Sequence, residues 1–151
     1  MGNKLREVIY FILSQKDRGI LKTQLIKLLF LVDLEFYRQR KETLTGLTYK
    51  LYLYGPYPPE IEKVLFKMEM QGYITLDERI SVSGKRYILY FAGDEEVQLS
   101  LTQDEISLIE SVLDKYGDKD LKELLSDVYS LDVVKAHNFG DILIPDVAGK
   151  A

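Results

Sequence analysis

Apolar residues recur at helical spacing at the start of the chain, where Leu5, Val8, Ile9 and Ile12 would share one face. This spacing predicts an amphipathic helix over residues 3–16. A second helix is predicted to begin behind Thr23, a residue type that caps helix N-termini. Its segment QLIKLLFLVDLEFY is apolar nearly all round, which is typical of a central, buried helix.

Asp33 lies inside the apolar segment of the second helix. A buried carboxylate destabilises a fold unless it is paired or hydrogen-bonded. Asp33 therefore either anchors a neighbouring stretch of backbone or faces a cleft. Because buried polar groups are generally hydrogen-bonded, the pattern favours the anchor.

From residue 47 the apolar positions recur with a period of two, which predicts a strand over residues 47–54. One face would carry Leu47, Tyr49, Leu51 and Leu53, and the other Thr48, Lys50, Tyr52 and Tyr54. Gly55 and Pro56 are predicted to end this strand. Pro58 and Pro59 suit the first turn of a helix, here over residues 58–71. The segment YLYGPYPPEI (residues 52–61) is thus predicted to form a proline-stiffened corner between strand and helix.

Two β-rich runs flank Ser83-Gly84 and predict a hairpin over residues 79–91. Further helices are predicted behind the capping box of Thr102 and Glu105, behind Asp118, and near residues 131–137. Together these elements predict a mainly helical α+β fold. It would comprise a winged-helix-like core at 3–92 that includes the β-hairpin, an acidic helical segment at 99–139 packed on it, and a loose tail at 140–151.

The composition fits one cytoplasmic domain. The chain has 151 residues, 46% of them apolar, and no cysteine, so disulfides and thiolate chemistry are excluded. No apolar run is long enough to span a bilayer, and no membrane partner is expected. Residues 1–93 contain 15 Lys/Arg and 10 Asp/Glu, a net charge of +5, whereas residues 94–151 contain 5 and 14, a net charge of −9. This asymmetry indicates either two surfaces with different partners or simply solvated acidic helices.

The sequence contains few of the groups that catalysis or metal binding requires. Its single histidine is His137, and neither a phosphate-binding glycine loop nor a Gly-x-Ser-x-Gly motif is present. We therefore expect no catalytic residues, no metal and no cofactor. An enzyme would instead need a deep pocket lined by Asp33, Glu35 or His137.

The tyrosines at the predicted corner are candidates for protein binding. Tyr52, Tyr54 and Tyr57, with Pro58 beside them, would present large rings on a stiff backbone at little cost in conformational entropy. The alternative is that these rings cover the corner and bond locally.

The winged-helix order also raises DNA binding, in which Arg79, Lys85 and Arg86 of the hairpin would contact phosphates. The helix that would read the bases opposes this function, because its three glutamates outnumber its two lysines. The hairpin charges could equally form an ordinary solvated tip.

The ordered motifs KLLFLVD and LTGLTYKLYLYGP, followed by an amphipathic helix, resemble the Panacea, or SocA-like, antitoxin domain over roughly residues 20–75. The matching positions are Asp33, Gly46, Tyr49, Tyr54, Gly55 and Pro56. The resemblance implies a non-enzymatic antitoxin that binds and neutralises a protein toxin encoded nearby, or a regulator built on that scaffold. We expect Asp33, Gly46, Gly55 and Pro56 to maintain the fold, and the neighbouring tyrosines to contact the partner.

Overall fold

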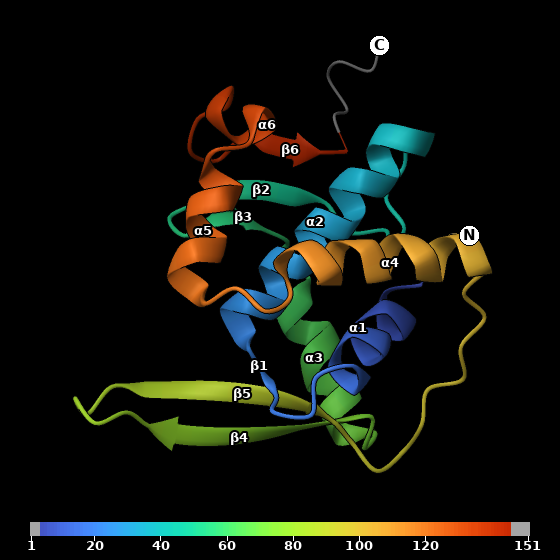
Figure 1. Cartoon of the computed structure of the whole chain (residues 1–151), viewed down its shortest axis with the longest axis vertical. Helices are drawn as coiled ribbons and strands as arrows, with labels where there is room; N and C mark the ends of the chain where they lie inside the picture. Colours follow the sequence, from blue (N-terminus) through green and yellow to red (C-terminus); the bar gives the residue numbers. More distant parts are fainter. Residues whose placement is uncertain (1–3, 146–151) are drawn as a thin grey trace.

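The computed structural model describes residues 4–145, which fold into six helices and two three-stranded antiparallel sheets. The two sheets lie toward opposite ends of the molecule, with helices between them (Figure 1). The predicted α+β class is confirmed.

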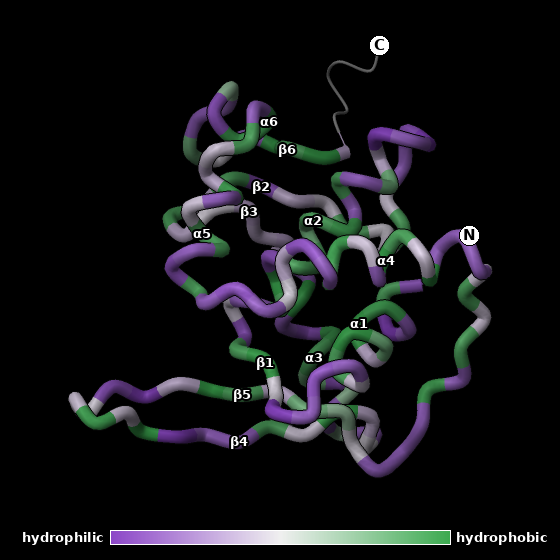
Figure 2. The backbone as a smooth tube through the Cα atoms, viewed as in Figure 1, coloured by the Kyte–Doolittle hydropathy of each residue, from purple (hydrophilic) through white to green (hydrophobic). Residues whose placement is uncertain are grey.

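Helices α1 (Leu5–Ser14) and α2 (Lys22–Arg40) contribute much of the hydrophobic core, and both are rich in hydrophobic positions in Figure 2. Helix α2 is buried on most sides, as its apolar sequence predicts. The prediction that Thr23 caps α2 is wrong, because the helix begins one residue earlier, at Lys22. The side chain of Gln24 instead accepts a hydrogen bond from the backbone N–H of Leu21 (3.1 Å).

The first sheet consists of β1 (Ile20–Leu21), β4 (Ile74–Ile80) and β5 (Arg86–Ala92) in the order β1-β5-β4. Strands β4 and β5 form a hairpin that begins five residues before the predicted residue 79 and projects from the molecule (Figure 1). A hairpin at Ser83-Gly84 is confirmed, and only its length was underestimated.

The second sheet consists of β2 (Tyr49–Tyr52), β3 (Gly55–Tyr57) and β6 (Ile142–Ile144) in the order β3-β2-β6. The predicted strand-to-helix corner is therefore wrong. Strand β2 ends at Tyr52, and the chain reverses over Leu53 and Tyr54 and returns antiparallel as β3. Gly55 has a φ of +99°, and a left-handed glycine directly after a two-residue turn is a common hairpin geometry.

Helix α3 (Ile61–Met70) begins after both prolines, with Glu60 at its N-cap. Pro58 and Pro59 thus lie in the connection from β3 and not in the first helical turn. The helix is amphipathic, as expected, with Ile61, Leu65 and Met68 buried on one face.

Helices α4 (Gln103–Tyr116) and α5 (Leu121–Tyr129) pack against α2, and the short α6 (Asp132–Lys135) follows. The capping box of Thr102 and Glu105 is confirmed. Asp118 does not cap α5, because Asp120 does so by accepting from the N–H of Glu123 (2.8 Å). Asp118 instead pairs with Lys16 of the segment after α1 (2.6 Å).

The prediction of a loose tail from residue 140 is wrong for β6, which pairs with β2 and buries Leu143 and Ile144. Residues 146–151 of that predicted tail lie outside the described residues. The last strand thereby covers one edge of β2.

Candidate protein-binding site

The turn between β2 and β3 presents apolar side chains to solvent. Leu53 and Tyr54 are 71% and 68% exposed, although the two-residue period grouped Leu53 with Tyr49, which is buried. Tyr52 and Tyr57 beside them are half-buried. Their rings meet edge to face with centroids 5.9 Å apart, and Tyr52 makes a second such contact, also at 5.9 Å, with the exposed Phe139. We call Tyr52, Leu53, Tyr54 and Tyr57 the hairpin surface.

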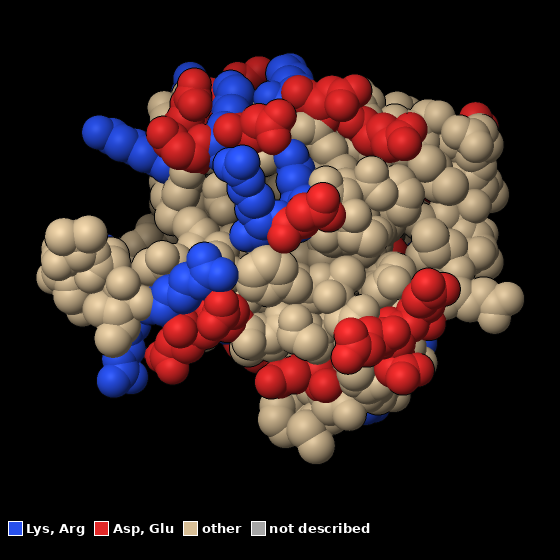
Figure 3. Space-filling model, turned by 60° about the horizontal axis from the view of Figure 1, so that its bottom comes forward, with Lys and Arg blue, Asp and Glu red and all other residues tan. Residues whose placement is uncertain are grey.

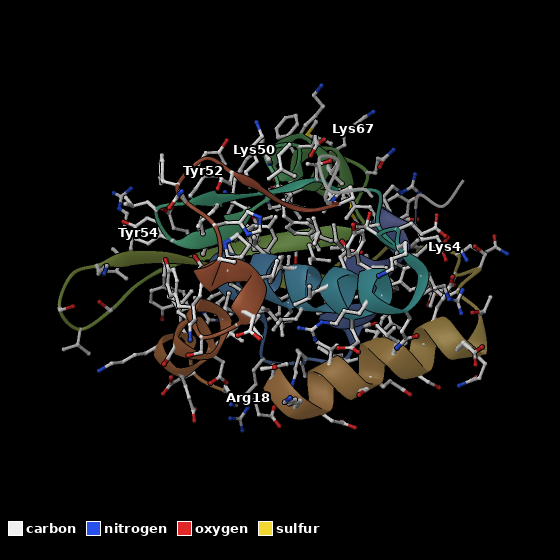
Figure 4. The ribbon with its side chains drawn as sticks, turned by 90° about the horizontal axis from the view of Figure 1, so that it is seen from above. Lys4, Arg18, Lys50, Tyr52, Tyr54 and Lys67 are labelled. Carbon is white, nitrogen blue, oxygen red and sulfur yellow. The ribbon has the colours of Figure 1, made fainter. Side chains whose placement is uncertain are left out.

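The hairpin surface borders a groove of about 400 Å³. The groove is lined by Lys27, Tyr52, Leu53, Tyr54, Gly55, Tyr57 and Pro59. Figure 4 shows Tyr52 and Tyr54 toward one side of the molecule, with Lys50 of β2 close to Tyr52. Three of the predicted contact residues therefore lie together around a single groove.

Two neighbouring helices hold the hairpin in place. The hydroxyl of Tyr129, at the end of α5, donates to the carbonyl oxygen of Leu53 (3.0 Å). The hydroxyl of Tyr57 donates to Glu62 of α3 (2.5 Å), and Glu62 also pairs with Lys22 (2.5 Å). Partial burial would raise the pKa of Glu62, but the hydrogen bonds from Lys22 and Tyr57 outweigh it and keep this pKa below its usual value. The Glu62 carboxylate therefore accepts from both groups in its ionised form.

Lys27 of α2 forms part of the groove, and the sequence analysis did not identify it. Its side chain is only 2% exposed, and its ammonium donates to the carbonyl oxygen of Pro56 (3.0 Å). Among residues 4–145 no carboxylate lies within ion-pair distance of it. Burial lowers the pKa of Lys27 from its usual 10.5 to about 8. The signal available in the sequence was a charged side chain within an otherwise apolar helical segment, the same signal that identified Asp33.

Pro58 does not belong to the exposed surface, because it is buried. Pro58 was chosen as a contact residue because the sequence predicted a strand-to-helix corner at this point. The chain forms the β2–β3 hairpin there instead. Pro59, which is exposed, lines the groove in its place.

Asp33 is the internal anchor of the loop between α2 and β2. One carboxylate oxygen accepts from the backbone N–H groups of Leu44 (2.8 Å) and Thr45 (3.1 Å). The other accepts from the hydroxyls of Thr45 (2.5 Å) and Tyr49 (2.6 Å). Burial raises the pKa of Asp33 to about 6, against the opposing effect of these four hydrogen bonds. Asp33 is fully buried, so the cleft interpretation is wrong.

Gly46 and Tyr49 complete the same loop. Gly46 has a φ of +83°, which permits the tight turn that brings its N–H to the hydroxyl of Thr43 (3.1 Å). Tyr49 is fully buried, with its ring edge to face against Phe30 of α2 at 5.3 Å. These positions therefore support the fold beneath the hairpin surface.

Replacing Tyr49 with Phe should lower the free energy of unfolding by about 1–3 kcal/mol, because a buried carboxylate loses one of its donors. Urea unfolding at pH 7 measures this change. Tyr87→Phe is the matched control, since no hydrogen bond of the Tyr87 hydroxyl is found within residues 4–145, and it should leave stability unchanged. Equal stability of Tyr49→Phe and the parent chain would show that the hydroxyl adds nothing to the anchor.

The basic residues proposed for DNA contact lie on the other hairpin. Arg79 pairs with Asp77 (2.8 Å), Arg86 pairs with Glu78 (3.7 Å), and Lys85 lies in the turn. Figure 3 brings this end of the molecule forward and shows basic and acidic side chains interspersed. Two of the three cations are thus already paired within their own hairpin.

The residues considered for catalysis do not share a site. Glu35 pairs with Arg38 (3.4 Å), and Nδ1 of His137 lies 2.7 Å from the carbonyl oxygen of Val133, while Asp33 is enclosed by its donors. Within residues 4–145 no group of three or more acidic or histidine side chains is arranged to hold a metal ion. No helix in the same part of the chain is long and apolar enough to cross a membrane.

Comparison with known protein families identifies a match. The model of the antitoxin SocA-like family, Panacea domain, matches residues 25–130. No curated protein and no solved structure matches the chain. The matched region runs from α2 to the end of α5 and so extends well beyond the motifs at residues 20–75. Because it covers more than half of the sequence, this chain belongs to the SocA-like antitoxin family and carries its Panacea domain.

Proposed function

We propose that this chain is a cytoplasmic, non-enzymatic antitoxin that binds a protein toxin encoded nearby and neutralises it by covering its active surface. The hairpin surface is the proposed contact region. The observation that supports this assignment is the exposure of Leu53 and Tyr54, 71% and 68%, at the tip of a restrained turn beside an apolar groove.

The hairpin surface combines exposed apolar area with a restrained backbone. Exposed apolar surface is unfavourable in water, so covering this turn with a partner protein lowers the free energy. Tyr129 and Glu62 already hold the turn and strand β3 of the hairpin, so binding has little backbone to order. Aromatic side chains have few rotatable bonds and large contact areas, which makes them common energetic centres of interfaces.

Expression of the adjacent reading frame tests the proposal. We expect its product to arrest growth when expressed alone, and growth to recover when the present chain is expressed with it. The two purified proteins should then form a complex by size-exclusion chromatography. Rescue without a complex, or a neighbour that forms a complex but is harmless, would contradict direct neutralisation of a toxin.

A DNA-binding regulator is the second candidate. The order α1, β1, α2, α3 and the β4–β5 hairpin, interrupted by the β2–β3 hairpin between α2 and α3, and the sheet order β1-β5-β4 support a winged-helix arrangement. Against this function, α3 with its N-cap carries Glu60, Glu62 and Glu69 but only two lysines, and the hairpin arginines are paired. We therefore expect no binding to duplex DNA at low salt. Binding whose affinity falls steeply with salt concentration would instead favour the regulator.

A further inference from the structure

We propose that the groove beside the hairpin surface receives an acidic side chain of the partner protein, and that Lys27 is the cation that pairs with it. This inference rests on the proposed antitoxin function and specifies the chemistry of the partner's anchoring residue.

Lys27 has unused capacity to donate hydrogen bonds. An ammonium group carries three N–H donors, and the carbonyl oxygen of Pro56 is the one acceptor found for it within residues 4–145. A buried charge without a counterion is unfavourable, and apolar side chains of similar length would fill the same space. Lys27 therefore resembles one half of an ion pair whose other half is missing from the free chain.

The groove has room for a side chain of the partner. Its volume of about 400 Å³ lies within the range of ligand-binding sites, which is about 300–1,000 Å³. Gly55 adds no side chain to it. A Cβ atom at this position would lie 3.3 Å from Cε of Lys27 and 3.8 Å from the hydroxyl of Tyr129, and so would occupy space next to the lysine.

Among residues 4–145, Lys27 is the one charged side chain that lines the groove, and its charge favours an anion. Glu62, the carboxylate next to Tyr57, is already paired with Lys22. Lys50 and Lys67 have no carboxylate within ion-pair distance among the described residues, and Figure 4 shows both on the same side of the molecule as Tyr52. Complementary charge of this kind guides association and fixes orientation.

The groove favours an acidic residue with apolar neighbours over a basic or purely apolar side chain of the partner. An arginine or lysine of the partner would be repelled by Lys27, and a purely apolar side chain would desolvate the ammonium further without pairing it. A carboxylate would use the free donors, while apolar flanking residues would cover Leu53 and Tyr54. Exclusion of water by these side chains strengthens the pair.

A small probe tests the pocket without the toxin. We expect 3-phenylpropanoate to shift the amide resonances of Tyr54, Gly55 and Tyr57 in two-dimensional NMR spectra, and the neutral 3-phenylpropanamide to shift them far less. In the Lys27→Met variant the selectivity for the carboxylate should disappear. Equal shifts by both probes, no shifts at millimolar concentrations, or selectivity that survives in Lys27→Met would each overturn the inference.

Binding to the toxin provides the second measurement. Lys27→Met should weaken the complex roughly 30-fold or more, as expected when one partner of a buried charge pair is removed. Lys50→Met, on β2 at the centre of the β3-β2-β6 sheet, is the control and should change affinity only a few-fold. Equal affinity of the parent and Lys27→Met chains would overturn this inference and leave the antitoxin function standing. Carboxylate-selective binding at Lys27 without any toxin binding would leave the anion site standing and contradict the antitoxin function.

Discussion

A chain carrying both Leu53→Ser and Tyr54→Ser should bind its toxin about 100-fold more weakly or worse, while its melting temperature changes by no more than about 2 °C. Truncating a central aromatic side chain of an interface often weakens the binding free energy by about 2 kcal/mol or more. Both side chains are largely exposed in the free chain, and surface substitutions of this kind usually change stability by about 0.5 kcal/mol or less. Isothermal titration calorimetry and thermal unfolding measure the two quantities.

Ile80 and Val82 provide a matched control, because they are 66% and 109% exposed at the tip of the other hairpin. The variant Ile80→Ser with Val82→Ser removes a similar amount of exposed apolar surface and should keep full affinity. If this control loses binding and the Leu53/Tyr54 variant does not, the contact surface lies on the β4–β5 hairpin. Tyr57→Ala is less suitable as a test, since loss of its hydrogen bond to Glu62 would also affect stability.

Lys27→Met should stabilise the free chain at pH 7, even though we expect it to weaken binding. The pKa of Lys27 is about 8 in the fold against 10.5 for an ordinary lysine, so the unfolded chain binds the proton more tightly. A shift of this size corresponds to about 3 kcal/mol. Loss of the hydrogen bond to Pro56 offsets about 1 kcal/mol of this stabilisation. The free energy of unfolding of the variant should therefore exceed that of the parent chain by about 2 kcal/mol.

The pH dependence gives this prediction a distinct signature. Between about pH 8 and 10.5 the folded chain binds fewer protons at Lys27 than the unfolded chain, so the stability of the parent protein should rise with pH across this window. Below pH 8 the full destabilisation is present. The difference in stability between the parent and Lys27→Met should therefore shrink from pH 7 to 10 in urea unfolding. A variant that is less stable than the parent at pH 7 would show that the hydrogen bond from Lys27 to β3 stabilises the fold by more than burial of the charge destabilises it.

Several elements followed from sequence because local patterns determine them. Helix α4 has a capping box and a regular apolar face. Asp33 was identified as an anchor because a carboxylate in an apolar helix requires donors. Each of these features depends on residues within a few turns of one another or on one general rule of burial.

The second sheet could not be predicted in the same way. Strand β3 has only three residues and contains Pro56, a composition tolerated in sheets mainly at edges. The strand β6 that pairs with β2 lies about 90 residues further along the chain. The two-residue period also continued through the turn, so Leu53 was assigned to the same strand face as Tyr49. Lys27 was overlooked because its carbonyl acceptor belongs to that unpredicted strand.

Pro56 has a further consequence for how the protein behaves in a crowded cell. It lies in the outermost strand of its sheet, has no N–H to donate, and its carbonyl oxygen is already bonded to Lys27. This edge therefore offers little to another β-strand, and strand addition is the usual route by which exposed sheets polymerise. The exposed apolar turn therefore adjoins a sheet edge that resists strand addition, and we expect the proposed partner to engage side chains rather than lengthen the sheet at β3.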